Sequence, residues 1–335
     1  METSKLIFRP YEEGDEHAIL ETFNRTFREV CGPDFEDRNL ETWRWEFLEN
    51  PSGCRIMLAL TSEGRVAAQY AGVPIKVSAE GRELSFFHAV DSMVHPEFRK
   101  GLRKRPLFLE VAERFFERFA GKVDHLGFGY PVRPAWRIGE RYLGYRLVQV
   151  LDFLLRGIEE PLPPHEAAAE VCEGVPPDCR ALLEELAPLH ACTTVRDEGY
   201  LRWRYFEAPS VRYRFLAARR AGKLVGFGVC RTEGGLVPEH AVLGDVFCDP
   251  GDLDCLAALL ERARVEALDA GRRGLMTVVN PHLEYDRSLK ALGFRAHPSG
   301  DWLERKLGAR DWTAGLEPEW LRRNWHYCLG DSDLF

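Results

Sequence analysis

The stretch NLETWRWEFLENP, residues 39–51, has a counterpart later in the chain, DEGYLRWRYFEAP, residues 197–209. Trp45 aligns with Trp203 at an offset of 158 residues, and both stretches end in proline. Three further pairs keep this order while the offset shrinks slowly, as deletions in loops would produce: EGRVAA (63–68) with AGKLVG (221–226), Asp91 with Asp245, and YLGY (142–145) with ALGF (291–294). Collinear matches of this kind predict two tandem copies of one fold.

A proline-rich segment separates the two copies. Residues 159–178 contain five prolines, which interrupt both helices and strands. Residues 302–335 carry half of the eight tryptophans, and so much apolar surface predicts a tail that docks across the two copies. We therefore predict four segments, which are a first copy (1–158), a linker and helix (159–194), a second copy (195–307) and a docking tail (308–335).

The composition is that of a globular protein in a reducing compartment. Apolar residues make up 45% of the chain. The chain has no run of about 18 apolar residues, so we expect no membrane span. The start, METSKLIFRPYEEGDEH, lacks the apolar segment of a signal peptide. The nine Cys and ten His are scattered without metal-ligand spacing, so we expect free thiols, no metal ion and a cytoplasmic location.

The net charge of −8 is distributed unevenly, with −1 in residues 1–158 and −7 in the remainder. A protein that binds extended nucleic acid usually carries a large basic face. We therefore expect no extended nucleic acid and no membrane as a partner, and we expect a monomer or a homodimer.

The first copy alternates helical and strand patterns. They predict an α/β sheet with helices packed on it. Strands within 55–95 are expected to turn at Glu63-Gly64 and Glu80-Gly81. The full predicted order is two helices (13–30 and 37–50), these strands, a helix (106–120), a strand (123–130), a helix (133–145) and a strand (146–156).

Residues 91–116, DSMVHPEFRKGLRKRPLFLEVAERFF, place a basic loop between a predicted strand and a predicted helix. Residues 99–105 contain five cations, and Pro106 suits the first helical position because its missing N–H costs nothing there. The free first-turn amides of Leu107 and Phe108 then make the helix start a site for an anion. The alternative is a solvated basic turn.

These residues resemble the core of the GNAT acyltransferases, which bind acetyl-CoA. Val94, Pro96 and Arg99 match the family's V-x-P-x-x-R. The stretch that begins Arg133-Pro134-Ala135 and ends Leu143-Gly144-Tyr145 echoes the family's N-P-A-x-x-x-x-Y-x-x-L-G-F.

Nearly the whole chain resembles tandem-GNAT acetyltransferases of the bacterial type, including their repeated W-R-W element and their C-terminal G-D-S-D (330–333). The resemblance implies two tandem GNAT-like domains, each a mixed, mostly antiparallel twisted sheet flanked by helices. It also implies an acyl-CoA site in the first copy and a degenerate second copy.

The resemblance implies acetyl-CoA, or another acyl-CoA, as the co-substrate. The family's pyrophosphate loop is R-G-x-G-x-G/A, whereas this loop has one glycine, so side-chain cations would substitute for close backbone approach. The implied binding residues come from the strand, the loop and two helix starts, and they are Met93, Val94, Arg99, Lys100, Gly101, Leu102, Arg103, Lys104, Arg105, Leu107 and Arg133.

Four residues are candidates for the proton transfers of acyl transfer to an amine. Asp91, in the strand before the loop, is the first candidate base, with a structural hydrogen bond as the alternative. Glu140 stands where the family has its general-acid tyrosine and is the second candidate base. Tyr142 or Tyr145 would protonate the leaving thiolate, or serve as core aromatics. His88 lies on the same strand as Asp91 and could face the same cleft, or be a satisfied core histidine.

The second copy carries acids where the first carries cations. Asp249, Asp252 and Asp254 occupy the loop before its helix, and negative charge there opposes phosphate binding. We therefore predict that the second copy binds no cofactor.

The activity implied by the resemblance is transfer of an acyl group, in the simplest case acetyl, from CoA to the amine of a small molecule or an amino sugar. Two alternatives remain open. One is a non-catalytic GNAT-like module that binds a ligand or partner. The other is an aminoacyl transferase that uses charged tRNA, for which the sequence shows little positive surface.

Overall fold

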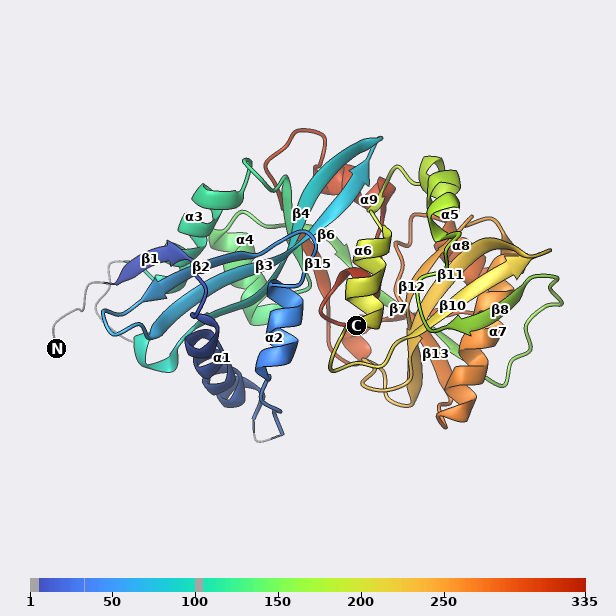
Figure 1. Ribbon diagram of the computed structural model, residues 1–335, viewed down its shortest axis with the longest axis horizontal. Coiled ribbons are helices and arrows are strands. Elements are labelled where there is room, and N and C mark those ends of the chain that lie inside the picture. Colours follow the sequence, from blue (N-terminus) through green and yellow to red (C-terminus); the bar gives the residue numbers. More distant parts are fainter. Residues whose placement is uncertain (1–5, 33, 100–104) are drawn as a thin grey trace.

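The computed structural model describes residues 6–32, 34–99 and 105–335, and it contains two twisted sheets side by side (Figure 1). Both sheets are mixed and mostly antiparallel, and helices pack on them. The predicted fold class, two tandem α/β units, is thereby confirmed.

The first sheet follows the order β1-β2-β3-β4-β5-β15-β6, in which β4 and β5 run parallel and the other neighbours run antiparallel. Two short strands extend it, since β9 pairs with β3 and β16 pairs with β9. The bounds are β1 Ile7–Pro10, β2 Arg55–Leu60, β3 Val66–Ala79, β4 Arg82–Val94, β5 Leu126–Gly129, β15 Lys306–Asp311, β6 Arg146–Val150, β9 Cys192–Thr194 and β16 Trp325–His326.

The second sheet follows the order β14-β7-β13-β12-β11-β10-β8, in which β12 and β13 are the parallel pair. Its central strands β12 and β13 correspond to β4 and β5 of the first sheet. The bounds are β14 Arg295–Pro298, β7 Asp152–Gly157, β13 Gly274–Thr277, β12 His240–Cys248, β11 Lys223–Arg231, β10 Arg214–Arg220 and β8 Ala168–Cys172.

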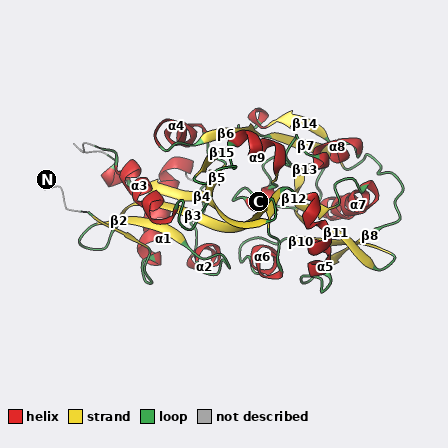
Figure 2. Ribbon diagram, turned by 90° about the horizontal axis from the view of Figure 1, so that it is seen from above, coloured by secondary structure: helices red, strands yellow, loops and turns green. Residues whose placement is uncertain are grey.

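Helices cover both faces of the sheets. Figure 2 shows α2, α6 and α5 along one side and α4 and α8 along the other. The bounds are α1 Glu16–Cys31, α2 Leu40–Phe47, α3 Leu107–Phe119, α4 Arg133–Tyr142, α5 Cys179–Leu186, α6 Glu198–Leu201 with a π-helical continuation Arg202–Phe206, α7 Leu253–Asp269, α8 Glu284–Ala291 and α9 Pro318–Asn324.

The sequence repeat is visible as local structure. The side chains of Asn39 and Asp197, 158 residues apart, cap α2 and α6 by accepting hydrogen bonds from Thr42 N and Tyr200 N, each at 2.8 Å. The two copies meet at these helices, where the rings of Trp45 and Trp203 stack 5.4 Å apart. Each indole N–H donates to the other residue's carbonyl, at 2.7 and 2.8 Å, so the contact is reciprocal.

The two sheets exchange strands. The sequence predicts one strand over 146–156, but the chain bends at Leu151, whose amide donates to Arg305 O at 2.9 Å. β6 therefore stays in the first sheet while β7 joins the second, and β15 returns from the far end of the chain to lie between β5 and β6. The four predicted segment boundaries stay a prediction, since strands cross between the sheets on either side of them.

The tail beyond β15 packs on both sheets. Trp312 contacts the rings of Phe87 and Phe116, and Trp325 packs edge-on against Phe86 and Phe128, all in the first copy. Further along, the Phe335 ring packs on Gly244 of β12, where a Cβ would lie 2.3 Å from it. No helix in the described ranges is both long and apolar enough to cross a membrane.

A stack of buried rings joins the tail to the second copy. His326 lies 4.5 Å from the Tyr285 ring and 4.9 Å from His190, and His190 lies 4.9 Å from Phe247. Burial, with the Arg196 charge, lowers the pKa of His190 to about 4. Burial also holds the pKa of His326 well below its ordinary value.

This stack predicts a pH-dependent stability. Because the pKa of His190 is lower in the folded chain, its contribution to stability is complete above about pH 6.5 and is lost as the pH falls towards 4. The loss from this residue should be roughly 3 kcal/mol. His190→Phe should remove that part of the pH dependence in urea unfolding at pH 7 and pH 4. The exposed His17, changed to Gln, is the control, and equal pH dependence in His190→Phe and wild type would contradict the account.

Candidate active site where strands β4 and β5 diverge

The parallel strands β4 and β5 pair over three positions only, Phe86 with Leu126, Phe87 with Gly127, and His88 with Phe128. Beyond His88, β4 continues to Val94 paired with β3, whereas β5 ends at Gly129. The helices that follow these strands, α3 and α4, begin at the same edge of the sheet. Ligands of α/β proteins bind at such carboxyl ends of parallel strands.

A β-bulge reshapes β4 just past this point. Gln69 pairs with Met93 but Ala71 pairs with Val90, so Asp91 and Ser92 share one partner on β3. Asp91 has a φ of 50°, a left-handed conformation that is costly for a residue with a side chain. The Gln69 amide donates to Asp91 O at 3.0 Å and supports it. Bulges re-aim the backbone of a strand, and this one turns the peptide groups after Asp91 out of the regular ladder.

Three charged side chains meet on the α1–α2 face of the bulge. The Arg38 guanidinium donates to the carboxylates of Asp91 and Glu46, the latter at 2.9 Å. Burial raises the pKa of Asp91 and raises that of Glu46 to about 7. One arginine therefore balances two buried carboxylates, and Glu46 is poised to gain or lose a proton near neutrality.

The second copy repeats this ion pair. Arg196 and Asp245, the counterparts of Arg38 and Asp91, lie 3.0 Å apart and are fully buried. Tyr205 also donates to Asp245, at 2.6 Å. Because both copies keep the pair, the geometry favours a positioning role for Asp91, while its predicted role as the base stays untested.

A cavity of about 200 Å³ lies beside this cluster, between the two copies. Its wall in the first copy contains Arg38, Glu46 and His88, and its wall in the second copy contains Arg204 and Tyr213. The tail closes it with Gly330–Asp333 and Phe335. His88 Nε2 lies 3.4 Å from a carboxylate oxygen of Asp333, and burial lowers the pKa of His88.

Tyr130 directly follows β5 at the divergence, and sequence reasoning missed it. Its ring lies 5.8 Å from His88, and its buried hydroxyl has no hydrogen-bond partner among the described residues. Burial raises the pKa of this phenol well above its ordinary value, so the hydroxyl keeps its proton. An orphaned buried donor at this place fits a bound group that accepts a hydrogen bond or a proton.

The other predicted catalytic residues lie apart from this cluster. Glu140 and Tyr142 are exposed on α4, with Arg141 over the Tyr142 ring. Tyr145 is buried on the opposite face of the sheet, where its hydroxyl pairs with that of Tyr70 at 2.9 Å. The structure thus does not bring them together with Asp91, and their catalytic roles stay predictions.

The predicted donor-binding residues that the structure describes come from the end of β4, the ends of the basic loop and the starts of α3 and α4. Met93 and Leu107 are buried, Val94 is half-buried and Arg133 is exposed in the first turn of α4. Both described ends of the basic loop are paired with carboxylates, Arg99 with Glu29 at 3.0 Å and Arg105 with Glu113. The remaining predicted contacts, Lys100, Gly101, Leu102, Arg103 and Lys104, lie outside the described residues.

The equivalent helix start in the second copy is filled by its own side chains. The Asp252 carboxylate caps α7 by accepting from Cys255 N at 3.0 Å. Arg220 bridges Asp252 and Asp254 at 2.7 Å each, and Asp254 also accepts from Ala167 N. This arrangement leaves little for a phosphate to bind and supports the predicted cofactor-free role.

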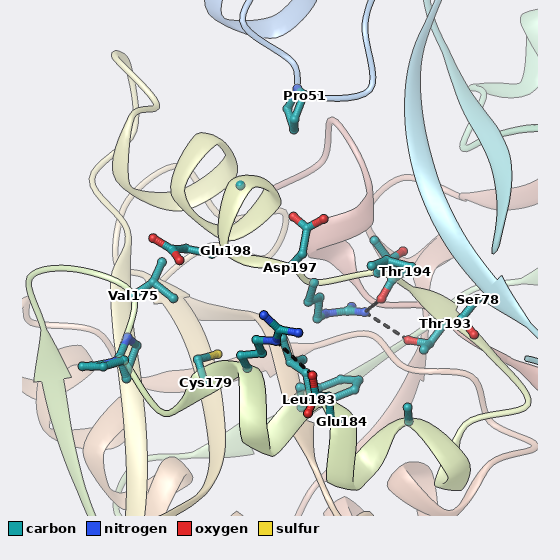
Figure 3. Close-up of a pocket in the computed structure, with 18 residues that line it drawn as sticks. Pro51, Ser78, Val175, Cys179, Leu183, Glu184, Thr193, Thr194, Asp197 and Glu198 are labelled. Carbon is teal, nitrogen blue, oxygen red and sulfur yellow. Dashed lines mark hydrogen bonds and ion pairs between the residues drawn. The ribbon is translucent and has the colours of Figure 1, made fainter.

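A larger cavity, of about 950 Å³, is lined by α5, the start of α6 and β12, together with Pro51 and Ser78 of the first copy (Figure 3). Its charges are already engaged, since Arg196 donates to Thr193 and Thr194 and Arg180 pairs with Glu184 at 2.9 Å. It is not at the divergence of β4 and β5, so it is not the candidate active site. In the described parts of the chain, no cluster of His, Cys, Asp or Glu is arranged to hold a metal ion.

Comparisons with known proteins agree with this geometry. Residues 8–147 match the family model of the acetyltransferase (GNAT) domain. No curated protein is similar enough in sequence to count as a relative.

Solved structures share the fold over nearly the whole chain. A probable N-acyltransferase from Enterococcus faecalis V583 is 11% identical with a TM-score of 0.65, covering 92% of this chain and 73% of its own. N-myristoyltransferase from Saccharomyces cerevisiae, solved with bound myristoyl-CoA, is 12% identical with a TM-score of 0.58, covering 97% and 84%. A tandem GNAT protein from the clavulanic acid biosynthesis pathway is 15% identical with a TM-score of 0.54, covering 92% and 98%.

Residues 8–147 are therefore similar to a GNAT acetyltransferase domain, and the whole chain has the fold of these solved structures, which include a tandem GNAT protein, as the sequence resemblance predicts. This fold generally binds acyl-CoA, and it supports an acyl-CoA-dependent N-acyltransferase in general terms.

The duplicated ion pair allows a test of the site's architecture. Arg38→Gln leaves the buried Asp91 and Glu46 carboxylates without a cation, so the free energy of unfolding should fall by roughly 3 kcal/mol. Arg28→Gln removes a half-exposed pair with Asp37 and should cost less than about 1 kcal/mol. Urea unfolding at pH 7 measures both, and equal losses in the two variants would contradict the assignment of Arg38.

Proposed function

We propose that the protein transfers an acyl group from acyl-CoA, in the simplest case acetyl-CoA, to the amine of a small molecule or an amino sugar. The observation that carries this proposal is a cavity that holds a carboxyl group with a pKa of about 7, Glu46, beside the divergence of two parallel strands. The 200 Å³ volume suits a small acceptor.

The described residues fit an acyl-CoA on three counts. The edge of β4 beyond His88 has no β5 partner, so its peptide groups are open to an extended chain. The hydroxyl of Tyr130 is buried at the same place and has no hydrogen-bond partner in the described part of the chain. The amides of Leu107 and Phe108, in the first turn of α3, have no acceptor among the described residues, and a helix N-terminus of this kind can bind a phosphate. A bound acyl-CoA would supply a thioester, whose acyl carbon is open to attack by an amine.

We assign each proton transfer to one residue of the site. Glu46, as a carboxylate, takes a proton from the acceptor's ammonium group, so that the nitrogen can form a bond to the acyl carbon. The backbone amides after the Asp91 bulge donate hydrogen bonds to the acyl oxygen as it gains negative charge. The Tyr130 hydroxyl donates its proton to the sulfur as the carbon–sulfur bond breaks. Arg38 donates to both Glu46 and Asp91 and so holds the Glu46 carboxyl group next to the bulge.

Binding and turnover test the function directly. Titration calorimetry with acetyl-CoA should give a dissociation constant of roughly 1–100 µM, within the usual range for enzyme substrates. A panel of amines and amino sugars should then show thiol release that depends on the acceptor. Lack of binding at about 1 mM acetyl-CoA would contradict the proposal, and binding without turnover on any acceptor would instead identify a non-catalytic module.

Glu46→Gln tests the base. The change should lower kcat/KM by roughly 10²- to 10⁴-fold while acetyl-CoA still binds, because general-base catalysis contributes about that factor. In wild type, kcat/KM should rise with pH through an inflection near 7, where the Glu46 carboxyl loses its proton, and the variant should lack that inflection. Glu49→Gln, an exposed residue just after α2, is the matched control. An unchanged pH profile in Glu46→Gln would reject this role.

A further inference from the structure

The tail segment Cys328–Phe335 is held by buried arginines of the second copy. Arg204 donates to the carbonyl oxygens of Gly330 and Ser332 at 3.0 Å and of Phe335 at 2.6 Å. Arg196 lies 3.4 Å from the Asp331 carboxylate. The backbone on both sides of Asp333 is therefore fixed by contacts that do not involve the Asp333 side chain.

The Asp333 carboxylate points away from these anchors and towards the first copy. It lines the cavity that contains Glu46, and one of its carboxylate oxygens lies 3.4 Å from His88 Nε2. Its side chain is 51% exposed, so a ligand in the cavity can reach it. A segment anchored in the second copy thus completes the acceptor cavity of the first.

No lysine or arginine in the described ranges forms an ion pair with Asp333. Burial lowers the pKa of His88, so its ring lies close to Asp333 at neutral pH without supplying a compensating charge. Asp333 interacts electrostatically with Arg305 but forms no ion pair with it, and Arg305 Nη1 donates to Tyr130 O at 3.5 Å.

The other cations near the cavity are engaged. Arg38 is shared between Asp91 and Glu46, and Arg204 donates to the tail carbonyls and to Tyr213. Arg231 donates to the carbonyls of Gly234 and Leu334. Asp333 therefore lines the cavity as a carboxylate without a lysine or arginine ion pair in the described ranges, and Glu46 lines the same cavity from the first copy.

We propose that Asp333 binds a second cationic group of the acceptor, so that the acceptor is a small diamine or a basic amine with two positive charges. One ammonium group lies at Glu46, where it loses its proton and reacts, and the other stays protonated at Asp333. This inference rests on the proposed acyltransferase function and narrows its acceptor class.

The test compares two acceptors of equal chain length, 1,4-diaminobutane and butylamine, with acetyl-CoA as donor. In wild type, kcat/KM should be at least about tenfold higher for the diamine, the ratio that one modest ion pair of about 1.4 kcal/mol produces. Asp333→Asn should reduce this ratio to near one, with most of the change in the KM for the diamine. Asp333→Glu should restore much of the ratio, which a merely structural role would not predict.

The controls separate the possible failures. Asp301→Asn, an exposed acid elsewhere in the chain, should keep the wild-type ratio, and an unchanged melting temperature should show that Asp333→Asn is folded. Transfer to butylamine but no preference for the diamine in wild type would overturn this inference and leave the acyltransferase proposal standing. Absence of transfer to any amine would overturn both.

Discussion

The buried arginine–aspartate pair is the constraint on which both halves of the molecule depend. In each copy it ties the segment before a short helix to the bulged central strand, Arg38 with Asp91 and Arg196 with Asp245. Breaking such a pair leaves an uncompensated charge in the interior, which is far more costly than losing a surface pair. The pair is therefore retained in both copies, even though their surroundings have diverged.

That divergence creates the site. At equivalent positions next to the pair, the first copy has Glu46 and the second has Arg204. Arg204 donates to the carbonyl groups of the tail, whereas Glu46, in the facing wall of the same cavity, is a carboxyl group with a raised pKa. The exchange of β7 and β15 between the sheets, together with the Trp45–Trp203 contact, holds the two copies in one arrangement. In this account the second copy serves as a scaffold that carries a tail into the first copy's site.

Much of the fold was predictable because its signals are local. These signals are the repeat around Trp45 and Trp203, the caps at Asn39 and Asp197, and the turn at Glu80-Gly81, each of which depends on neighbours in sequence. Glu80 and Gly81 both adopt a positive φ, as a turn at this place requires. The strand over 146–156 was predicted as one because its apolar pattern is continuous. Its division at Leu151 depends on a hydrogen bond to Arg305, more than 150 residues away.

The site was less predictable for the same reason. Glu46, Tyr130 and Asp333 come from a helix, a strand end and the tail, and nothing in their local sequence marks them as neighbours. One signal was available, since the repeat aligns Glu46 with Arg204 and so exposes a charge reversal inside a matched motif. Asp91 was found from its place in an apolar strand, but its partner Arg38 lies 53 residues earlier and could not be inferred.

A crystal structure with acetyl-CoA bound is the most direct test of this account. We expect the acyl group at the divergence of β4 and β5, with its oxygen within roughly 3 Å of a backbone amide after Asp91 and its carbon facing the Glu46 cavity. Acetyl-CoA bound instead in the large cavity beside α5, or along β12 and β13 of the second copy, would contradict it.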